Sequence, residues 1–397
     1  MDFRAYEMRL RDVLQRRESA FTDGEYQRRC QALDRRLDER GLDALLVTNP
    51  AEIYYLTGYN TFEVSVHAAL VYSPSQSVLQ VPSIETGTAV ACARVDHILG
   101  YRWEAPGEVV EPLADCLAAQ GRRIGVDRWG AGLRSGLLAG LEQQLPDREW
   151  VDASGLLDPI RRVKSGEELE CLEQAARLTE AGVEAARRTV AVGRTDSQVA
   201  AAAAEAMYGH GSEFMSMQPI VVAGPRSSVI HTNHRRFPIQ AGEPVFIELG
   251  AAFQRYTSPI MHTIVAGSGA PDPRMQAMFE ACRRVYDTLV AAMKPGATFD
   301  SAAQAAESAW QDESEEAFFS GVYGYTIGGQ FPPSWVEGSG FIARGQPTEF
   351  EENMVFHLPL CFRIPGLWGM GFSETVRVTR QCAVPVTRNR WQLESGG

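Results

Sequence analysis

The pattern of apolar and polar positions predicts two regions of different character. Up to about residue 160, short apolar, β-branched runs alternate with helical stretches, which is typical of an α/β domain of ordinary size. Beyond the boundary, a long amphipathic pattern over residues 167–192 predicts a helix with acidic residues in its first turn. We therefore expect an N-terminal α/β domain over 1–160, a second domain over 161–385, and a tail over 386–397.

Within the first region, the apolar runs at 43–48 and 68–72 predict strands. The aromatic-rich segment 54–59 lies between them and contains one glycine, so we expect a loop there. Helical spacing with many charges over residues 1–41 predicts amphipathic helices at the edge of the domain.

In the second region, the pattern predicts further helices and strands in a repeated order. Helices are expected at 196–208, 273–293 and 299–313, and strands at 220–223, 354–358 and 374–379. A helix pair followed by strands, occurring twice, indicates a faint internal duplication.

The segment 245–267 has a hairpin pattern, with two apolar runs around a softer middle. Glu248 lies inside the first run, flanked by Ile247 and Leu249. Carrying a carboxylate into an apolar layer costs several kcal/mol unless the group is paired or neutral. Glu248 is therefore either a structural ion-pair partner or a functional group, and the residues alone leave both interpretations open.

Composition excludes several classes of protein. The 397 residues are 45% apolar and 22% charged, as in soluble globular enzymes, and a net charge of −12 with scattered basic residues provides no nucleic-acid footprint. No apolar run approaches the roughly 20 residues of a membrane helix. Seven cysteines without a CxxC pair indicate free thiols, so we expect a cytoplasmic protein.

Common catalytic motifs are also missing. Neither of the two lysines, Lys164 and Lys294, follows a glycine, so there is no phosphate-binding loop. The zinc motif HExxH and the nucleophile motif GxSxG are absent as well.

Several motifs together carry a family resemblance. Leu56-Thr57-Gly58-Tyr59, the boundary segment 162–168, the 245–267 hairpin, the motif 324–328 and the closing segment 374–379 occur in the order of the creatinase/aminopeptidase P (M24) family. The chain resembles this family over nearly its whole length. The resemblance implies a "pita-bread" α+β catalytic domain after the N-terminal α/β domain.

The metal-dependent members of this family hold two divalent ions with five side chains, and the resemblance places those positions in this chain. The two aspartates fall on Glu248 and Pro259, the histidine on Tyr325, and the two late glutamates on Pro359 and Glu374. A dinuclear site needs several oxygen or imidazole ligands. Because only two acids remain, we expect no metal cofactor.

The departures resemble one subgroup, the metal-free ectoine hydrolases, which open the cyclic amidine ring of ectoine. The shared features are Glu248, the segment 255–259, Tyr325 in its motif, the segment 332–337, Phe356-His357, an aromatic residue four past Gly58, and Val66-His67. The segment 231–234, by contrast, is closer to creatinase, and Met261-His262 stand where an arginine is usual before Thr263. These differences leave the identity of the substrate open.

The resemblance implies roles for particular side chains. Glu248 is expected to be the nucleophile and His231 the acid/base, since a histidine with an ordinary pKa of about 6.5 transfers protons in both directions near neutral pH. Glu374 is expected to join them as a third catalytic residue, holding the cationic ring. The predicted substrate-binding residues are Tyr59, Phe62, His67, Tyr325, Trp335, Glu337 and His357.

Each of these residues also has a structural interpretation, which stays open at this point. His231 and His67 are otherwise hydrogen-bonded turn residues, and Trp335 is core packing after two prolines. Tyr325 fills the space that the metal would take, and Glu337 is a solvated loop acid.

The leading functional prediction is a metal-independent hydrolase that cleaves a C–N bond of a small cationic amidine such as ectoine. The alternatives are a creatinase-like hydrolase of a guanidino acid, a metal-dependent Xaa-Pro aminopeptidase or prolidase, and a non-catalytic pita-bread binding protein. Family analogy further implies a homodimer in which the loop near Phe62 and His67 reaches the neighbour's site, and a deacetylase acting on the product.

Overall fold

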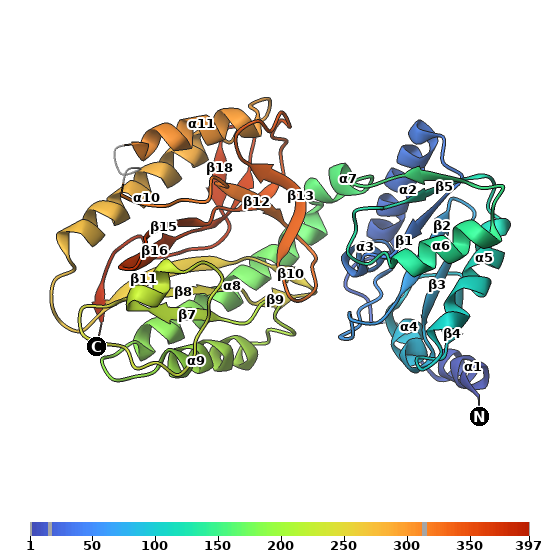
Figure 1. Ribbon diagram of the computed structural model, residues 1–397, viewed down its shortest axis with the longest axis horizontal. Coiled ribbons are helices and arrows are strands. Elements are labelled where there is room, and N and C mark those ends of the chain that lie inside the picture. The colour runs from blue at the N-terminus through green and yellow to red at the C-terminus, as the bar shows by residue number, and fades with distance from the viewer. Residues whose placement is uncertain (1, 15–17, 312–315, 397) are drawn as a thin grey trace. The chain divides into compact units, whose positions relative to one another are not determined.

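A computed structural model of the chain describes residues 2–14, 18–311 and 316–396. It contains two compact units, Met1–Ile160 and Arg161–Gly397, which are described separately below (Figure 1). No helix in the described ranges is both long enough and apolar enough to span a bilayer.

The N-terminal unit is an α/β domain. Its helices are α1 (Phe3–Val13), α2 (Asp23–Arg40), α3 (Pro50–Thr57), α4 (Thr86–Cys92), α5 (Val110–Ala118) and α6 (Ser135–Gln144), with short turns η1 (Ser83–Glu85) and η2 (Pro106–Val109). Its strands are β1 (Ala44–Val47), β2 (Ala69–Ser73), β3 (Gln76–Pro82), β4 (His97–Tyr101), β5 (Arg123–Val126) and β6 (Glu149–Asp152). Helix α7 (Asp158–Arg162) contains the boundary between the units.

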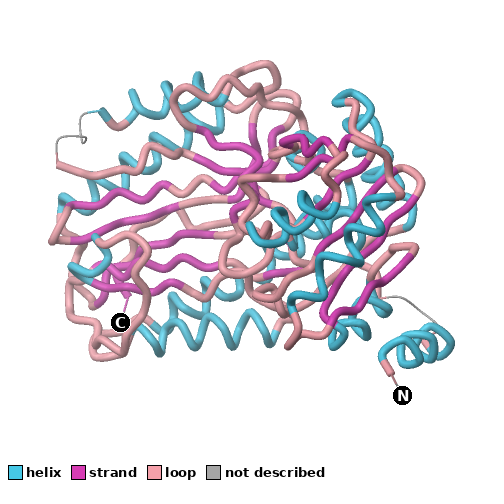
Figure 2. The backbone as a smooth tube through the Cα atoms, turned by 45° about the vertical axis from the view of Figure 1, so that its right-hand side comes forward, coloured by secondary structure: helices cyan, strands magenta, loops and turns pink. Residues whose placement is uncertain are grey.

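The six strands of this unit form one sheet in the order β4-β3-β2-β1-β5-β6. Alternate residues of a strand point to opposite faces, and here both faces are apolar. Leu45 and Val47 pack in one core cluster, whereas Ala44 and Leu46 pack in another. Helices lie along both faces of the sheet (Figure 2).

The expectation of a loop over 54–59 is wrong. The segment from Pro50 to Thr57 is helix α3, which begins at the N-cap Asn49 and a first-turn proline and ends at Gly58 with φ of 78°. Its tyrosines supply an apolar helix face, and the aromatic residues obscured the capping signals at each end.

The C-terminal unit is α+β. Its helices are α8 (Gly166–Thr189), α9 (Asp196–Gly209), α10 (Pro273–Ala292) and α11 (Phe299–Ala309), with the turn η3 (Gly224–Ser228). Its strands are β7 (Ile220–Ala223), β8 (Pro244–Leu249), β9 (Ala252–Phe253), β10 (Tyr256–Thr257), β11 (Ile260–Ala266), β12 (Gly324–Ile327), β13 (Val336–Ile342), β14 (Val355–His357), β15 (Leu360–Ile364), β16 (Trp368–Phe372), β17 (Thr375–Val378), β18 (Ala383–Pro385) and β19 (Ser395–Gly396).

Two larger sheets carry this unit. One has the order β19-β11-β8-β7 and the other β13-β12-β14-β17-β18, while β15 and β16 form a separate hairpin. Helices α8 and α9 contribute to the core of the first sheet, and α10 and α11 to the core of the second. Each helix pair therefore serves one sheet, as the faint duplication in the sequence predicts.

The predicted hairpin at 245–267 is present as β8 and β11, with Glu248 directly opposite Met261. Between them, Phe253 and Tyr256 pair across a two-residue turn, Gln254-Arg255, in which both residues have positive φ. This geometry is that of a type I′ turn, although neither residue is glycine.

The predicted separate tail is instead part of the C-terminal unit. Strand β19 pairs with β11 through Val265 and Ser395, and the backbone N–H of Asn389 donates to Glu374. The sequence of this segment is polar, so its pattern does not reveal these long-range contacts.

Candidate active site

Glu248 lies on the face of β8 that turns away from helices α8 and α9. The neighbours Ile247 and Leu249 belong to the core shared with these helices, so alternation places Glu248 on the opposite face. Its cross-strand partners are Ile220 and Met261. The sequence pattern had placed this acid in an apolar layer, and the structure confirms that placement.

The environment of this carboxylate is unusual. Glu248 is only 9% exposed, and among the described residues no hydrogen bond or ion pair reaches its side chain. Burial raises the pKa of Glu248 to about 7, and the nearby Arg363 guanidinium opposes that rise. The interpretation of Glu248 as a structural ion-pair partner is therefore not supported by the described contacts.

A hydrogen-bonded chain of side chains lies beside Glu248. The Tyr325 hydroxyl accepts from Trp335 Nε1 at 2.9 Å and lies 2.8 Å from His357 Nδ1. His357 Nε2 lies 2.7 Å from Ser373 Oγ, which also accepts from the backbone N–H of Met261 at 2.6 Å. The chain thus reaches from β12 to the strand that pairs with Glu248.

Burial fixes the protonation states of this chain. It lowers the pKa of His357 to about 3, so the imidazole is neutral and has one N–H. The pKa of Tyr325 is raised well above its ordinary value, first by burial and then by the charge of Glu248. Tyr325 is therefore protonated at neutral pH, with its hydroxyl close enough to Glu248 for the carboxylate charge to act on it.

The contacts of His357 fit either of its two neutral tautomers. If Ser373 donates to His357 Nε2, then His357 Nδ1–H donates to Tyr325, whose oxygen also accepts from Trp335. The Tyr325 hydroxyl proton is then free to be donated to another group. In the other tautomer, His357 Nε2–H donates to Ser373 and the Tyr325 hydroxyl donates to His357 Nδ1. Only the first tautomer leaves Tyr325 as a donor to a further group.

A cavity of about 660 Å³ opens next to this region. Its lining residues are Tyr208, Phe214, Met215, Ser216, Met217, Gln218, Ile220, His231, Thr232, Asn233, Pro332, Pro333 and Ser334. Ile220 is the cross-strand partner of Glu248, and Ser334 precedes Trp335. Its volume suits a small molecule, and its lining is mostly apolar with a few polar groups.

His231 lies on the exposed rim of this cavity, with a positive φ of 56°. Non-glycine residues in this backbone region are uncommon and cluster at functional sites. The segment is held by Arg226, which donates to the Asn233 carbonyl at 2.6 Å and pairs with Asp196. The acid/base role of His231 stays a prediction.

The predicted catalytic residue Glu374 has a different setting. Its carboxylate accepts from Thr387 Oγ1, from the Asn389 backbone N–H at 2.8 Å and from Trp391 Nε1 at 3.1 Å. Burial raises its pKa to about 7, and these three donors oppose the rise. The described hydrogen bonds of this carboxylate all come from the C-terminal segment, and the neighbouring Ser373 contacts His357 instead.

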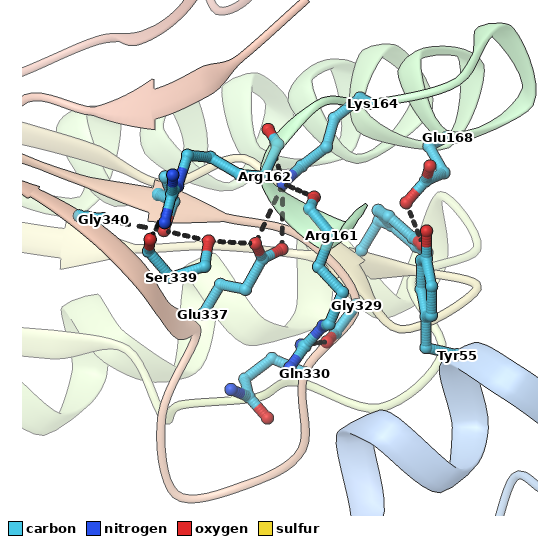
Figure 3. Close-up of polar contacts among 12 residues, drawn as sticks. Tyr55, Arg161, Arg162, Lys164, Glu168, Gly329, Gln330, Glu337, Ser339 and Gly340 are labelled. Atoms are coloured by element: carbon cyan, nitrogen blue, oxygen red, sulfur yellow. Dashed lines mark hydrogen bonds and ion pairs between the residues drawn. The ribbon is translucent and has the colours of Figure 1, made fainter. Parts of the chain in front are cut away.

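The structure corrects both interpretations of Glu337. Its carboxylate is 2.9 Å and 3.1 Å from Lys164 Nζ and accepts from Ser339 at 2.6 Å, in a buried ion pair (Figure 3). It is neither a solvated loop acid nor a side chain open to a substrate. A Cβ at Gly328 would lie 1.9 Å from Glu337 Oε2, so glycine is required there.

The three predicted substrate-binding residues of the N-terminal unit have separate environments. Tyr59 is buried and donates to Glu85 at 3.1 Å, and His67 is buried with Nε2 3.1 Å from Gln80 Oε1. Phe62 is 76% exposed. For Tyr59 and His67, internal hydrogen bonds account for the burial of the polar atoms involved, and the substrate roles of all three residues stay predictions.

Among the predicted residues, the structure brings together Glu248, Tyr325, Trp335 and His357. Trp335 is 1% exposed, so it is both a core residue and a hydrogen-bond donor to the site. Sequence reasoning missed Ser373 and Arg363. A charged residue inside the apolar run Leu360–Ile364 is the same kind of signal that marked Glu248, and it identifies Arg363.

The residues at the site do not fit a pair of divalent ions. Within the described part of the chain, no three His, Cys, Asp or Glu side chains gather into a group able to hold a metal. Both ring nitrogens of His357 are engaged, and Pro259 and Pro359 offer no side-chain donor. Glu248 is thus left without the further ligands that a dinuclear centre requires.

Comparison with known proteins agrees with the two units. Residues 29–163 match the creatinase/prolidase N-terminal domain, and residues 170–380, more than half of the chain, match metallopeptidase family M24. The chain is 28% identical to the uncharacterized hydrolase/peptidase y4tL of Sinorhizobium fredii, with 94% of this chain and 97% of the relative covered. It is 23% identical to the Xaa-Pro dipeptidase of Pyrococcus furiosus, with 92% and 99% covered.

Solved structures share the fold over both units. An X-Pro aminopeptidase from Thermotoga maritima superposes with a TM-score of 0.80 at 19% identity, covering 92% of this chain and 99% of that one. The dipeptidase PepE from Mycobacterium ulcerans has a TM-score of 0.80 at 24% identity, covering 94% and 99%. The expected fold, a creatinase-like N-terminal domain followed by a pita-bread domain, is confirmed. The chain therefore belongs to the hydrolases of metallopeptidase family M24.

Proposed function

We propose that this M24 hydrolase opens a C–N bond of a small cationic amidine, such as ectoine, without a metal ion and with Glu248 as the nucleophile. The observation that carries the proposal is the buried Glu248 carboxylate, to which no described residue donates a hydrogen bond. Glu248 lies beside the hydrogen-bonded side chains of Tyr325, His357 and Ser373, and by the family resemblance Glu248 and Tyr325 occupy two of the metal-ligand positions. Such a carboxylate is costly to fold and is available for reaction.

In the proposed reaction, a Glu248 oxygen supplies the electron pair for a new bond to the amidinium carbon. The C=N electrons move onto one ring nitrogen, and the other ring nitrogen takes up a proton. Its bond to that carbon then breaks to release an amine, while the lone pair of the first nitrogen re-forms the C=N bond. Water then adds to the same carbon and loses a proton, and the C=N electrons return to nitrogen. The bond to Glu248 breaks to regenerate the carboxylate as the oxygen from water loses its second proton and forms the amide C=O. The balance is one substrate and one water giving one ring-opened amide.

Side chains of the protein support each stage of this reaction. Glu248 attracts the cation. With His357 Nδ1 protonated, the Tyr325 hydroxyl keeps its proton free and donates a hydrogen bond as charge changes at the reacting carbon. His231, on the rim of the cavity, is the proposed proton shuttle. Trp335 and His357 hold the Tyr325 oxygen in place.

A second candidate is a metal-dependent Xaa-Pro dipeptidase. The named relatives favour it, because two proteins at 23% identity over about nine-tenths of this chain are Xaa-Pro dipeptidases. The residues at the ligand positions disfavour it, since two are prolines and one is a tyrosine.

Incubation of metal-stripped protein with ectoine and, separately, with creatine tests the proposal. We expect mass spectrometry to detect ectoine plus one water, at a rate that a chelator does not change. Cleavage of an Xaa-Pro dipeptide only after addition of manganese, with both amidino compounds untouched, would establish the second candidate instead. No turnover of any of the three would indicate a binding protein.

A further inference from the structure

Arg363 lies on the face of β15 that turns toward Glu248. Along this strand, Leu360 and Phe362 belong to the core that contains α10, so Cys361 and Arg363 point to the other side. Cys361 packs there in a small apolar cluster with Phe246. Because Phe246 and Glu248 are two residues apart on β8, their side chains share one face of the sheet.

The guanidinium of Arg363 is incompletely bonded. Its Nη1 folds back along the strand and donates to the Cys361 carbonyl at 3.4 Å, and its Nε is buried with no hydrogen-bond partner among the described residues. A buried donor without a partner costs free energy, and natural proteins leave few of them. A buried donor of this kind is able to bind the acceptor group of a ligand.

Arg363 and Glu248 are close without being paired. The charge of Arg363 lowers the pKa of Glu248, and both groups influence the Cys361 thiol, yet the described residues include no ion pair between the two side chains. Ile220, the cross-strand partner of Glu248, lines the 660 Å³ cavity, so Glu248 lies beside this cavity. The site therefore presents a negative and a positive group that are not neutralised by direct contact.

We propose that Arg363 binds the carboxylate of a zwitterionic substrate whose cationic carbon meets Glu248. A guanidinium matches a carboxylate with two parallel hydrogen bonds, whereas a lysine would offer a single point charge. The inference rests on the proposed function and narrows its substrate class to small amino-acid-like compounds that carry both an amidinium or guanidinium group and a carboxylate. A plain amidine lacks one of the two contacts.

The test compares ectoine with 2-methyl-1,4,5,6-tetrahydropyrimidine, the same ring without a carboxylate. The wild-type protein is expected to prefer ectoine by about 100-fold in kcat/KM, the size of a charge-assisted pair of hydrogen bonds. Arg363→Gln should lower kcat/KM for ectoine by about 100-fold and change that for the plain ring by less than about threefold. Arg363→Lys should retain more of the preference than Arg363→Gln, because lysine keeps the positive charge but cannot donate two parallel hydrogen bonds.

Arg380→Gln is the matched control, because the Arg380 side chain is 86% exposed. It should leave kcat/KM unchanged for both compounds. Thermal melting of each variant distinguishes a folding defect from a loss of recognition. Equal losses for both rings in the Arg363→Gln variant, or no preference in the wild-type protein, would overturn the inference.

Calorimetric binding separates this inference from the proposed reaction. In a Glu248→Gln protein that cannot turn over, ectoine should still bind about 100-fold more tightly than the plain ring, and Arg363→Gln should remove that difference. If the wild-type protein opens neither ring but this affinity difference is present, the proposed reaction is contradicted and carboxylate binding by Arg363 is supported. If neither ring binds, or both bind equally, the carboxylate site is wrong.

Discussion

Glu337 and Glu248 are both buried carboxylates in the C-terminal unit, but their surroundings are opposite. Glu337 has an ion pair with Lys164 and a hydrogen bond from Ser339. Glu248 receives no hydrogen bond from any described residue, and burial raises its pKa to about 7. A buried charge with a complete set of partners is part of the structure, whereas one without partners is kept at a cost to stability and marks a site of chemistry.

The largest expected effect is the loss of activity when Glu248 is replaced. Glu248→Gln should lower kcat by about 10³-fold or more, because the amide cannot attack the substrate carbon. Glu170→Gln, which changes an exposed acid of the same unit, should leave kcat unchanged. Steady-state kinetics with ectoine would measure both. An active Glu248→Gln variant would contradict the nucleophile role.

The next effect tests Glu337 by stability. Lys164→Met should lower the free energy of unfolding by about 3–5 kcal/mol, since it leaves the Glu337 charge buried and unpaired. Lys294, the only other lysine in the sequence, is exposed, and Lys294→Met should change stability by less than about 0.5 kcal/mol. Urea titration measures the difference. Equal stability of the two variants would mean that the buried pair is not structural.

Replacing Glu248 should raise the free energy of unfolding at high pH, whereas replacing Lys164 lowers it. A folded-state pKa of about 7, above the unfolded value of 4.5, means that the folded state binds the proton more tightly. The carboxylate therefore costs stability progressively as pH rises from about 4.5 to 7, by up to about 3 kcal/mol. Glu248→Gln should be more stable than wild type at pH 8 and not at pH 4. A gain that does not depend on pH would contradict this origin.

A smaller effect concerns the hydroxyl beside Glu248. Tyr325 accepts from Trp335, and Tyr323 accepts from Trp310 at 3.0 Å, so each tyrosine to phenylalanine change removes the same kind of bond. Tyr325→Phe should lower kcat about 10–100-fold, as loss of a hydrogen-bond donor to the reacting groups does. Tyr323→Phe should change the melting temperature alone. Equal kcat values for the two variants would remove Tyr325 from the mechanism.

The sequence predicted the local elements of the fold well. Two apolar runs located β8 and β11 and, within the first, an acid whose position in an apolar strand was itself the signal. The amphipathic pattern over 167–192 located α8, and the structure adds that this helix begins at a capping box of Ser165 and Glu168. These features depend on residues that are close in the chain.

The sequence failed where distant segments meet. Lys164 and Glu337 are 173 residues apart, and no local pattern pairs them. Ser373 and Glu374 are adjacent, and which of them faces His357 depends on how the chain passes from β16 to β17. Arg363 became a candidate only from the structure. Leu360 and Phe362 pack in the core on one face of β15, so alternation places Arg363 on the other face.

The most direct test of the central claim is acid-quenched turnover followed by peptide mass spectrometry. In the proposed reaction the intermediate retains every atom of the substrate, so the peptide that contains Glu248 should gain the mass of one ectoine molecule during turnover by metal-stripped protein. The adduct should be absent from the Glu248→Gln variant. Turnover that continues with Glu248 unmodified at every quench time, and that stops when a chelator removes bound metal, would contradict the account.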